Sequence, residues 1–158
     1  MRLRKIISGG QTGVDRAGLD AALALGIEIG GWCPKGRRAE DGAIPDIYPL
    51  RETKADDYPE RTRLNVRDSD GTLILNVGPL DGGTKRTYEL ALELRKPCSL
   101  VDLDEEPNVG KFKTWLEQHN VGILNVAGPR ESKRPGLQAR ATAFLRKLFA
   151  EVVTRAGH

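Results

Sequence analysis

Short apolar runs alternate with helix-like segments along the whole sequence, and this alternation constrains the fold more than any other feature. In the last segment, for example, Leu137, Ala141, Phe144 and Leu148 recur at helical spacing. A chain with this pattern folds into parallel strands covered by helices. We therefore predict a single α/β domain over residues 1–158, built on a doubly wound parallel sheet. The strand-like runs are residues 4–8, 27–32, 71–77, 98–103 and 121–127.

The first strand-like run ends in a turn that contains Gly9, Gly10 and Gly13, and a helical pattern follows at once. Glycine at such a turn permits a positive φ and lets a ligand approach the backbone. The N–H groups at the start of the next helix favour an anion, because the positive end of the helix dipole lies there. The spacing matches neither the Walker motif nor G-x-G-x-x-G. By itself, the turn is as consistent with a structural connection as with an anion site.

Two more glycine-rich turns, at 78–84 and 128–132, follow later strands. Because the carboxyl ends of parallel strands meet at one edge of a sheet, we expect all three turns to lie together where ligands bind. Nearby cations and hydroxyl groups suit phosphate oxygens. The predicted ligand-binding residues are Gly9, Gly10, Gln11, Thr12, Gly13, Asp15, Arg16, Lys35, Gly36, Arg37, Arg38, Gly82, Gly83, Thr84, Gly128, Arg130 and Ser132.

The segment 33–58 has no regular pattern, although it carries Lys35, Arg37 and Arg38 just after a predicted strand. A connection of this length without its own structure is uncommon in a compact domain and is often functional. The helix predicted from residue 58 to about 68 is unusually polar, since Leu64 and Val66 are its strong hydrophobes. Its polar side chains face either water, or a site or partner subunit.

The composition favours a small anionic ligand over nucleic acid, because the net charge is only +3 and aromatic residues make up 5% of the chain. We expect no membrane association, since no apolar run approaches the roughly 20 residues that span a bilayer. The basic N-terminus lacks the apolar core of a signal peptide. These features predict a cytoplasmic protein.

The sequence offers few candidates for catalysis. His119 and His158 are far from the glycine turns, and no serine or cysteine is paired with a histidine for nucleophilic catalysis. Cys33 and Cys98 lack a metal-binding or redox spacing, so we expect buried thiols and no metal site. The candidate catalytic carboxylates are Asp15 and Glu89, for which a role at the helix start and a solvated helix face, respectively, are the simpler interpretations.

Several long segments together resemble the putative molybdenum carrier family over nearly the whole chain. They are ISGGQTGVDRA at 7–17, GWCPKGRRAEDG at 31–42, YPLRET at 48–53, NVRDSDGT at 65–72 and NVAGPR at 125–130. The resemblance implies a Rossmann-like fold, in a group that includes lysine-decarboxylase-like cytokinin-activating enzymes and DNA-processing protein A. It also implies a phosphate-bearing ligand, nucleotide-like or molybdopterin-like, with the molybdenum cofactor as the suspected ligand, in a homo-oligomer (dimer or tetramer).

One departure from the wider group bears on activity. The cytokinin-activating relatives carry a proline-glycine-glycine-x-glycine-threonine motif with a glutamate, and they cleave an N-glycosidic bond. Here the matching stretch keeps Gly82, Gly83, Thr84 and Glu89 but lacks the third glycine. The first hypothesis is therefore a carrier that binds a phosphate-bearing ligand at the glycine turns. The alternative is a nucleotide-processing enzyme such as a phosphoribohydrolase, with Glu89 or Asp15 assisting the attack of water.

Overall fold

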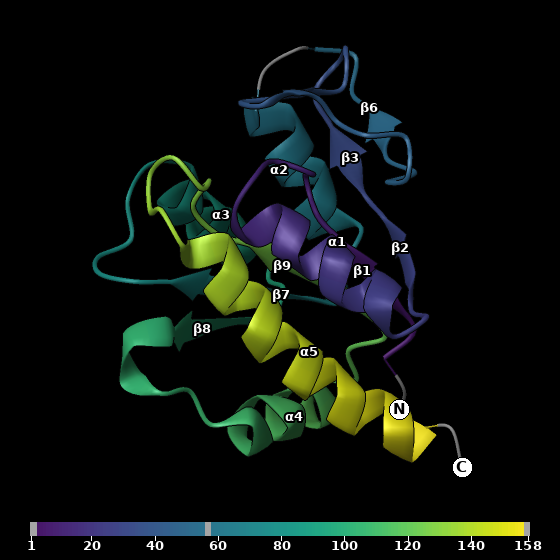
Figure 1. The fold of residues 1–158 in the computed structure, drawn as a ribbon, viewed down its shortest axis with the longest axis vertical. Helices are drawn as coiled ribbons and strands as arrows, with labels where there is room; N and C mark the ends of the chain where they lie inside the picture. Colours follow the sequence, from purple (N-terminus) through teal and green to yellow (C-terminus); the bar gives the residue numbers. More distant parts are fainter. Residues whose placement is uncertain (1–2, 56–57, 157–158) are drawn as a thin grey trace.

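A five-stranded parallel sheet forms the centre of the computed structural model, which describes residues 3–55 and 58–156 (Figure 1). The strand order is β2-β1-β9-β7-β8, and each neighbouring pair is parallel. The α/β, Rossmann-like fold is therefore confirmed. The strands are β1 (Lys5–Ile7), β2 (Glu28–Gly30), β7 (Gly71–Asn76), β8 (Cys98–Asp102) and β9 (Ile123–Ala127).

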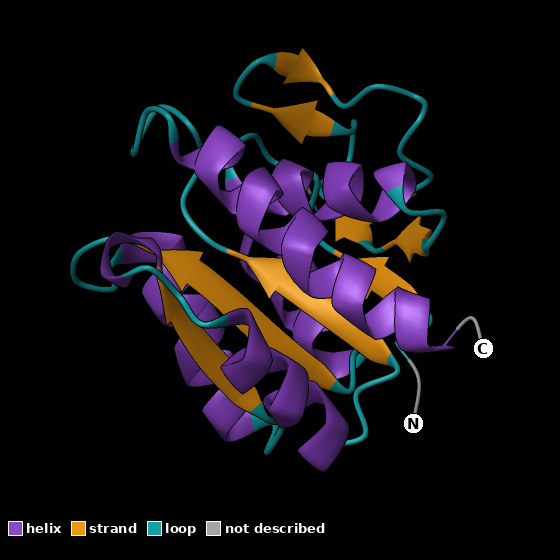
Figure 2. Ribbon diagram, turned by 60° about the horizontal axis from the view of Figure 1, so that its bottom comes forward, coloured by secondary structure: helices purple, strands orange, loops and turns teal. Residues whose placement is uncertain are grey.

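Helices cover both faces of the sheet (Figure 2). In the view of Figure 1, α1, α4 and α5 lie in front of the sheet, and α2 and α3 lie behind it. Gly18 lets α1 pack closely on the sheet, because a Cβ at this residue would lie 2.8 Å from Cβ of Val126 in β9. The helices are α1 (Val14–Ala24), α2 (Tyr58–Arg67), α3 (Gly82–Glu93), α4 (Val109–Gln118) and α5 (Leu137–Ala156), with a short 3₁₀ helix at Leu103–Glu105.

The segment after β2 forms small strand pairs rather than an irregular connection. The predicted strand at 27–32 is wrong beyond Gly30, because the chain turns at Gly31, where φ is 127°. A side chain there would also meet the carbonyl oxygen of Ser8, 2.3 Å from the Cβ position. After this turn, β3 (Trp32–Cys33) pairs with β6 (Arg51–Glu52), and β4 (Arg38–Ala39) forms a hairpin with β5 (Gly42–Ala43).

The core and the thiols follow the sequence pattern. Ile6, Leu73 and Leu124 from three neighbouring strands are fully buried. Cys33 is buried and Cys98 is half-buried, and burial raises the pKa of both thiols, that of Cys98 to about 11. Among the described residues, none of the helices has the length and apolar character needed to cross a bilayer.

Candidate functional site

A cavity of about 250 Å³ lies at the carboxyl-end edge of the sheet, where the three glycine turns meet. The first turn contributes Gln11 and Asp15, the second follows β7, and the third follows β9. Residues from all three turns, or from the helix start directly after one, therefore line the same cavity. The described residues that line the cavity are Gln11, Asp15, Arg61, Thr62, Gly83, Thr84, Thr87, Ala127, Gly128, Pro129, Arg130 and Lys133.

The second glycine turn presents the N-terminus of α3 to this cavity. Asp81, at the N-cap, makes no side-chain hydrogen bond to the helix. Instead, its carboxylate lies 2.6 Å from Nζ of Lys133, and the hydrogen bond from Lys133 holds the pKa of Asp81 below its usual value. Among the described residues, no protein group accepts from the N–H groups of Gly83 and Thr84. These two donors are therefore available to a ligand in the cavity.

Asp15 and Arg61 form an ion pair at the cavity wall, with 3.0 Å between Oδ2 and Nη1. Asp15 is buried, and burial raises the pKa of its carboxyl group against the opposing effect of Arg61. Gly9 leaves the space for this guanidinium, because a Cβ at residue 9 would lie 1.6 Å from Nη1. Among the described residues that line the cavity, Asp15 is the one carboxylate.

The first glycine turn differs, because the protein itself uses its N–H groups. Three of them donate to side-chain oxygens: Gly10 to Oγ of Ser8, Thr12 to Oε1 of Gln11, and Gly13 to Oε1 of Gln138. At the start of α1, Val14 donates to the carbonyl of Pro129. The predicted cradle is therefore present as a turn, but protein groups satisfy these donors.

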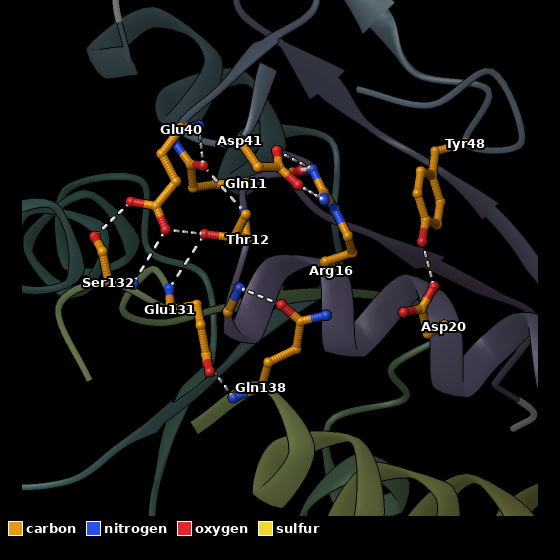
Figure 3. Close-up of polar contacts among 12 residues, drawn as sticks. Gln11, Thr12, Arg16, Asp20, Glu40, Asp41, Tyr48, Glu131, Ser132 and Gln138 are labelled. Atoms are coloured by element: carbon orange, nitrogen blue, oxygen red, sulfur yellow. Dashed lines mark hydrogen bonds and ion pairs between the residues drawn. The ribbon is translucent and has the colours of Figure 1, made fainter. Parts of the chain in front are cut away.

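The tip of the β4–β5 hairpin brings two carboxylates to the first turn (Figure 3). Glu40 accepts from the Thr12 hydroxyl, and from N–H and Oγ of Ser132 at 3.1 and 2.5 Å. Its Oε1 also lies 3.3 Å from Nε of Arg130. Burial alone would raise the pKa of Glu40, but the hydrogen bonds from Ser132 and Thr12 outweigh it and lower that pKa. Asp41 pairs with Arg16 at 2.6 Å.

The structure brings some of the predicted ligand-binding residues together and separates others. The predicted residues that line the cavity are Gln11, Asp15, Gly83, Thr84, Gly128 and Arg130. Gly9 lines a narrow extension of about 10 Å³ beside it, with Asn65, Thr87 and Asn125. Gly82 lies near Lys133, since a Cβ there would be 3.1 Å from Nζ. Thr12 and Ser132 surround Glu40 rather than lining the cavity.

The basic loop lies away from the cavity. The Arg37 guanidinium donates to the carbonyls of Ile44, Pro45, Tyr48 and Leu50, and so holds the loop in shape. Arg16 pairs with Asp41 and donates to the carbonyl of Gly10. Lys35, Gly36 and Arg38 are exposed on the same segment. Gly10 and Gly13 contribute turn geometry rather than cavity lining.

Sequence reasoning did not place Arg61, Thr62 or Thr87 at the site, although all three line the cavity. The polar composition of α2 was the available signal for the first two. Glu89 is exposed on α3 and lies 3.8 Å from Arg86, outside the cavity lining. His119 is at the C-cap of α4, beside Trp115. Among the described residues, no cluster of three His, Cys, Asp or Glu side chains could hold a metal ion.

Comparison with known proteins gives two matches of wide coverage. A sequence model of the "Circularly permutated YpsA SLOG family" matches residues 6–149. The chain is also 45% identical to a crystal structure named putative molybdenum carrier protein, from Syntrophus aciditrophicus SB. That similarity covers 93% of this chain and 94% of the other, with a TM-score of 0.86. No curated protein matches the chain.

Proposed function

The chain belongs to the circularly permutated YpsA SLOG family, and from this premise we propose that it is a carrier for a phosphate-bearing ligand. The ligand is nucleotide-like or molybdopterin-like, and its phosphate binds in the cavity at the carboxyl-end edge of the sheet. The similar structure from Syntrophus aciditrophicus, named as a putative molybdenum carrier, supports the molybdenum cofactor as cargo.

One observation carries this proposal: the uncapped N-terminus of α3 lies beside cations at the same cavity. The N–H groups of Gly83 and Thr84 supply directional donors, and the helix dipole adds partial positive charge. Arg130 and Lys133 supply full charges on the adjacent wall. Such a set suits the three terminal oxygens of a phosphomonoester.

The size of the cavity sets how much of the ligand it encloses. A volume of about 250 Å³ is smaller than the roughly 300–1,000 Å³ of sites that enclose a whole drug-sized ligand. The phosphate and the group next to it fit inside, and the rest of the ligand lies at the mouth. A carrier requires this kind of reversible binding and no nucleophile.

Isothermal titration calorimetry with AMP, adenosine and the molybdenum cofactor tests the proposal. We expect the phosphate-bearing ligands to bind and adenosine to bind at least about tenfold more weakly, since it lacks the charge-assisted hydrogen bonds. Lys133→Glu lowers the affinity by at least about tenfold for the same reason. Lys35→Glu is the matched control, because it changes the same charge on the exposed loop outside the cavity.

Two results would contradict the proposal. In the first, neither AMP nor the molybdenum cofactor binds. In the second, Lys35→Glu weakens the binding of these ligands more than Lys133→Glu does. The second result would move the phosphate to the basic loop after β3, whose cations were among the ligand-binding residues predicted from the sequence.

The second candidate function is hydrolysis of a nucleoside monophosphate by water to the free base and ribose 5-phosphate. The position of Asp15 favours this candidate, because it is a buried carboxylate at the cavity wall. Chromatography of AMP incubated with the protein would detect free adenine. The hydrolase candidate would be supported if adenine formed, if Asp15→Asn abolished its formation and if Glu89→Gln left it unchanged. If no adenine were released, the hydrolase candidate would be rejected.

We also propose that the chain assembles as a homo-oligomer, a dimer or tetramer. Large apolar side chains exposed on the single chain support this, since Leu92 on α3 is 60% exposed and Leu100 on β8 is 45% exposed. Light scattering coupled to size exclusion measures the mass. A multiple of 17.3 kDa supports the proposal, and a single chain of 17.3 kDa contradicts it.

A further inference from the structure

The donors around Glu40 form a compact anion site beside the cavity, which shares Arg130 with it. We propose that this site is an anion subsite for phosphate oxygens, and that Glu40 occupies it until a phosphate group takes its place. The inference deepens the proposed function and rests on it for the identity of the natural ligand. The subsite itself is assigned from the contacts of one carboxylate.

Four donors from two remote segments converge on the Glu40 carboxylate, and Figure 3 shows those of Thr12 and Ser132. The four donors are the hydroxyl of Thr12, the N–H and hydroxyl of Ser132, and Nε of Arg130. The Thr12 side chain is also fixed from its other side, because its Oγ1 accepts from N–H of Glu131 at 3.2 Å. Backbone N–H, hydroxyl and guanidinium groups are the donors that proteins use for phosphate. The site is therefore prearranged for an anion, whichever group supplies it.

The subsite is continuous with the cavity through two residues. Arg130 lines the cavity and lies 3.3 Å from Glu40 through Nε. Gln11 also lines the cavity, and its Oε1 accepts from N–H of both Thr12 and Glu40. A phosphate bound in the cavity thus lies beside the same guanidinium that holds the Glu40 carboxylate.

The cavity cations share one further property: each lies beside a carboxylate of the protein. Arg61 pairs with Asp15, Arg130 with Glu40, and Lys133 with Asp81. Asp15 is buried, whereas the side chains of Glu40 and Asp81 are 25% and 56% exposed. An incoming dianion competes with these carboxylates for the cations, and the two exposed ones can leave into water.

The position of Glu40 at a hairpin tip allows its side chain to leave the subsite with little structural change. Glu40 and Asp41 form the two-residue tip of a hairpin whose strands each have only two residues. A hairpin of this size has little stability of its own, so docking of its tip holds it in place. Asp41, the other residue of the tip, pairs with Arg16. Displacement of Glu40 therefore needs a shift of the tip and no rearrangement of the sheet.

Titration with inorganic phosphate tests the subsite without any assumption about the natural ligand. We expect Glu40→Ala to bind phosphate at least about tenfold more tightly than the unsubstituted protein, because the donors are vacated and a like charge is removed. Glu52→Ala is the matched control, since Glu52 also accepts from a backbone N–H of this loop, that of Gly36, but lies outside the subsite. Ser132→Ala in the Glu40→Ala background should remove most of the gain.

Glu40→Gln controls for a loss of hairpin structure in Glu40→Ala, because glutamine keeps the size of the side chain and lacks its charge. It should also bind phosphate more tightly than the unsubstituted protein. Phosphate affinity that is unchanged or reduced in both variants would overturn the subsite. So would a gain that Ser132→Ala leaves intact, because the phosphate would then be bound elsewhere.

The outcomes separate this inference from the proposed function. If AMP binds in a manner that depends on Lys133 while neither Glu40 variant gains affinity for phosphate, the carrier function stands and the subsite is wrong. If both variants gain affinity for phosphate while AMP and the molybdenum cofactor bind to no variant, the subsite stands and the proposed function is wrong.

Discussion

The first and second glycine turns look alike in sequence, since each joins the end of a strand to a helix, yet their backbone donors differ in use. At the first turn, Gly10, Thr12 and Gly13 donate to oxygens of the protein. At the second turn, Gly83 and Thr84 face a cavity without a described protein acceptor. A glycine-rich turn therefore predicts a set of donors but not what accepts from them.

The difference arises partly from Ser8 and Gln11 of the first turn itself and partly from the segments that surround each turn. The first turn is enclosed by the β4–β5 hairpin, the loop after β9 and the start of α5 (Figure 3). Each of them supplies an acceptor: the Glu40 carboxylate accepts from the Thr12 hydroxyl, the Pro129 carbonyl from N–H of Val14, and Oε1 of Gln138 from N–H of Gly13. The second turn meets the Lys133 ammonium group, which adds positive charge instead of an acceptor. Protein groups therefore accept from the N–H groups of the first turn, whereas no described residue accepts from those of Gly83 and Thr84.

The largest contrast is expected between the carboxylates of the two turns. Asp15→Ala leaves the half-buried Arg61 guanidinium without its paired carboxylate, and we expect a loss of about 3–5 kcal/mol in the free energy of unfolding. Asp81→Ala removes an exposed ion pair with Lys133 at the cavity, so the free energy of unfolding should stay nearly unchanged. Urea denaturation of both variants measures the difference. Equal losses in the free energy of unfolding would mean that the carboxylates of the two turns do not differ in their contribution to stability.

The next contrast is between the glycines themselves. Gly13 has φ of 84°, and a Cβ there would lie 2.2 Å from the carbonyl oxygen of Pro129. We expect Gly13→Ala to cost at least about 2 kcal/mol, from the left-handed backbone and the overlap together. At Gly83, a Cβ would meet no described atom within 4 Å.

For this reason Gly83→Ala should raise the free energy of unfolding, by up to about 1 kcal/mol, because alanine loses less backbone entropy in a helix. Chemical denaturation of both variants measures these opposite signs. A destabilising Gly83→Ala would show that the start of α3 is packed more tightly than the open cavity indicates.

The sequence predicts the sheet and the meeting of the three turns because both depend on local pattern. Alternating strands and helices imply parallel strands, and parallel strands place their carboxyl ends at one edge. At the first turn, the acceptors on Ser8 and Gln11 are local, but those on Gln138 and Glu40 depend on remote contacts. Gln138 lies 125 residues after Gly13, and Glu40 lies 28 residues after Thr12. No local pattern indicates that these side chains return to the turn.

The directions of the basic side chains also could not be predicted from local sequence. A basic residue near a strand end is visible in the sequence, but the direction of its side chain is not. Arg37 donates to carbonyls of its own loop, whereas Arg61 reaches Asp15 from α2. The position of α2 depends on non-local hydrogen bonds such as that from N–H of Trp32 to Asn65. Its polar residues left open whether they face water, or a site or partner subunit, and only the tertiary structure shows that Arg61 and Thr62 line the cavity.

The smallest expected effect concerns the pH dependence of the hairpin tip at the first turn. The folded-state pKa of Glu40 lies below its ordinary value of 4.5, because hydrogen bonds from Ser132 and Thr12 outweigh the cost of its burial. The stabilisation from the ionised carboxylate is therefore complete above pH 4.5 and is lost as the pH falls through the folded-state pKa. We expect about 1 kcal/mol between the unsubstituted protein and Glu40→Gln at neutral pH.

Urea denaturation of the two proteins from pH 7 to pH 3 measures this difference, which should shrink toward zero at the acid end. Ser132→Ala should show a shallower dependence on pH than the unsubstituted protein, because it removes one of the hydrogen bonds that lower the pKa of Glu40. A difference between Glu40→Gln and the unsubstituted protein that is constant over this range would mean that the carboxylate charge does not hold the hairpin tip. The first turn would then be closed by shape alone, and the contrast with the second turn would not rest on the occupant's charge.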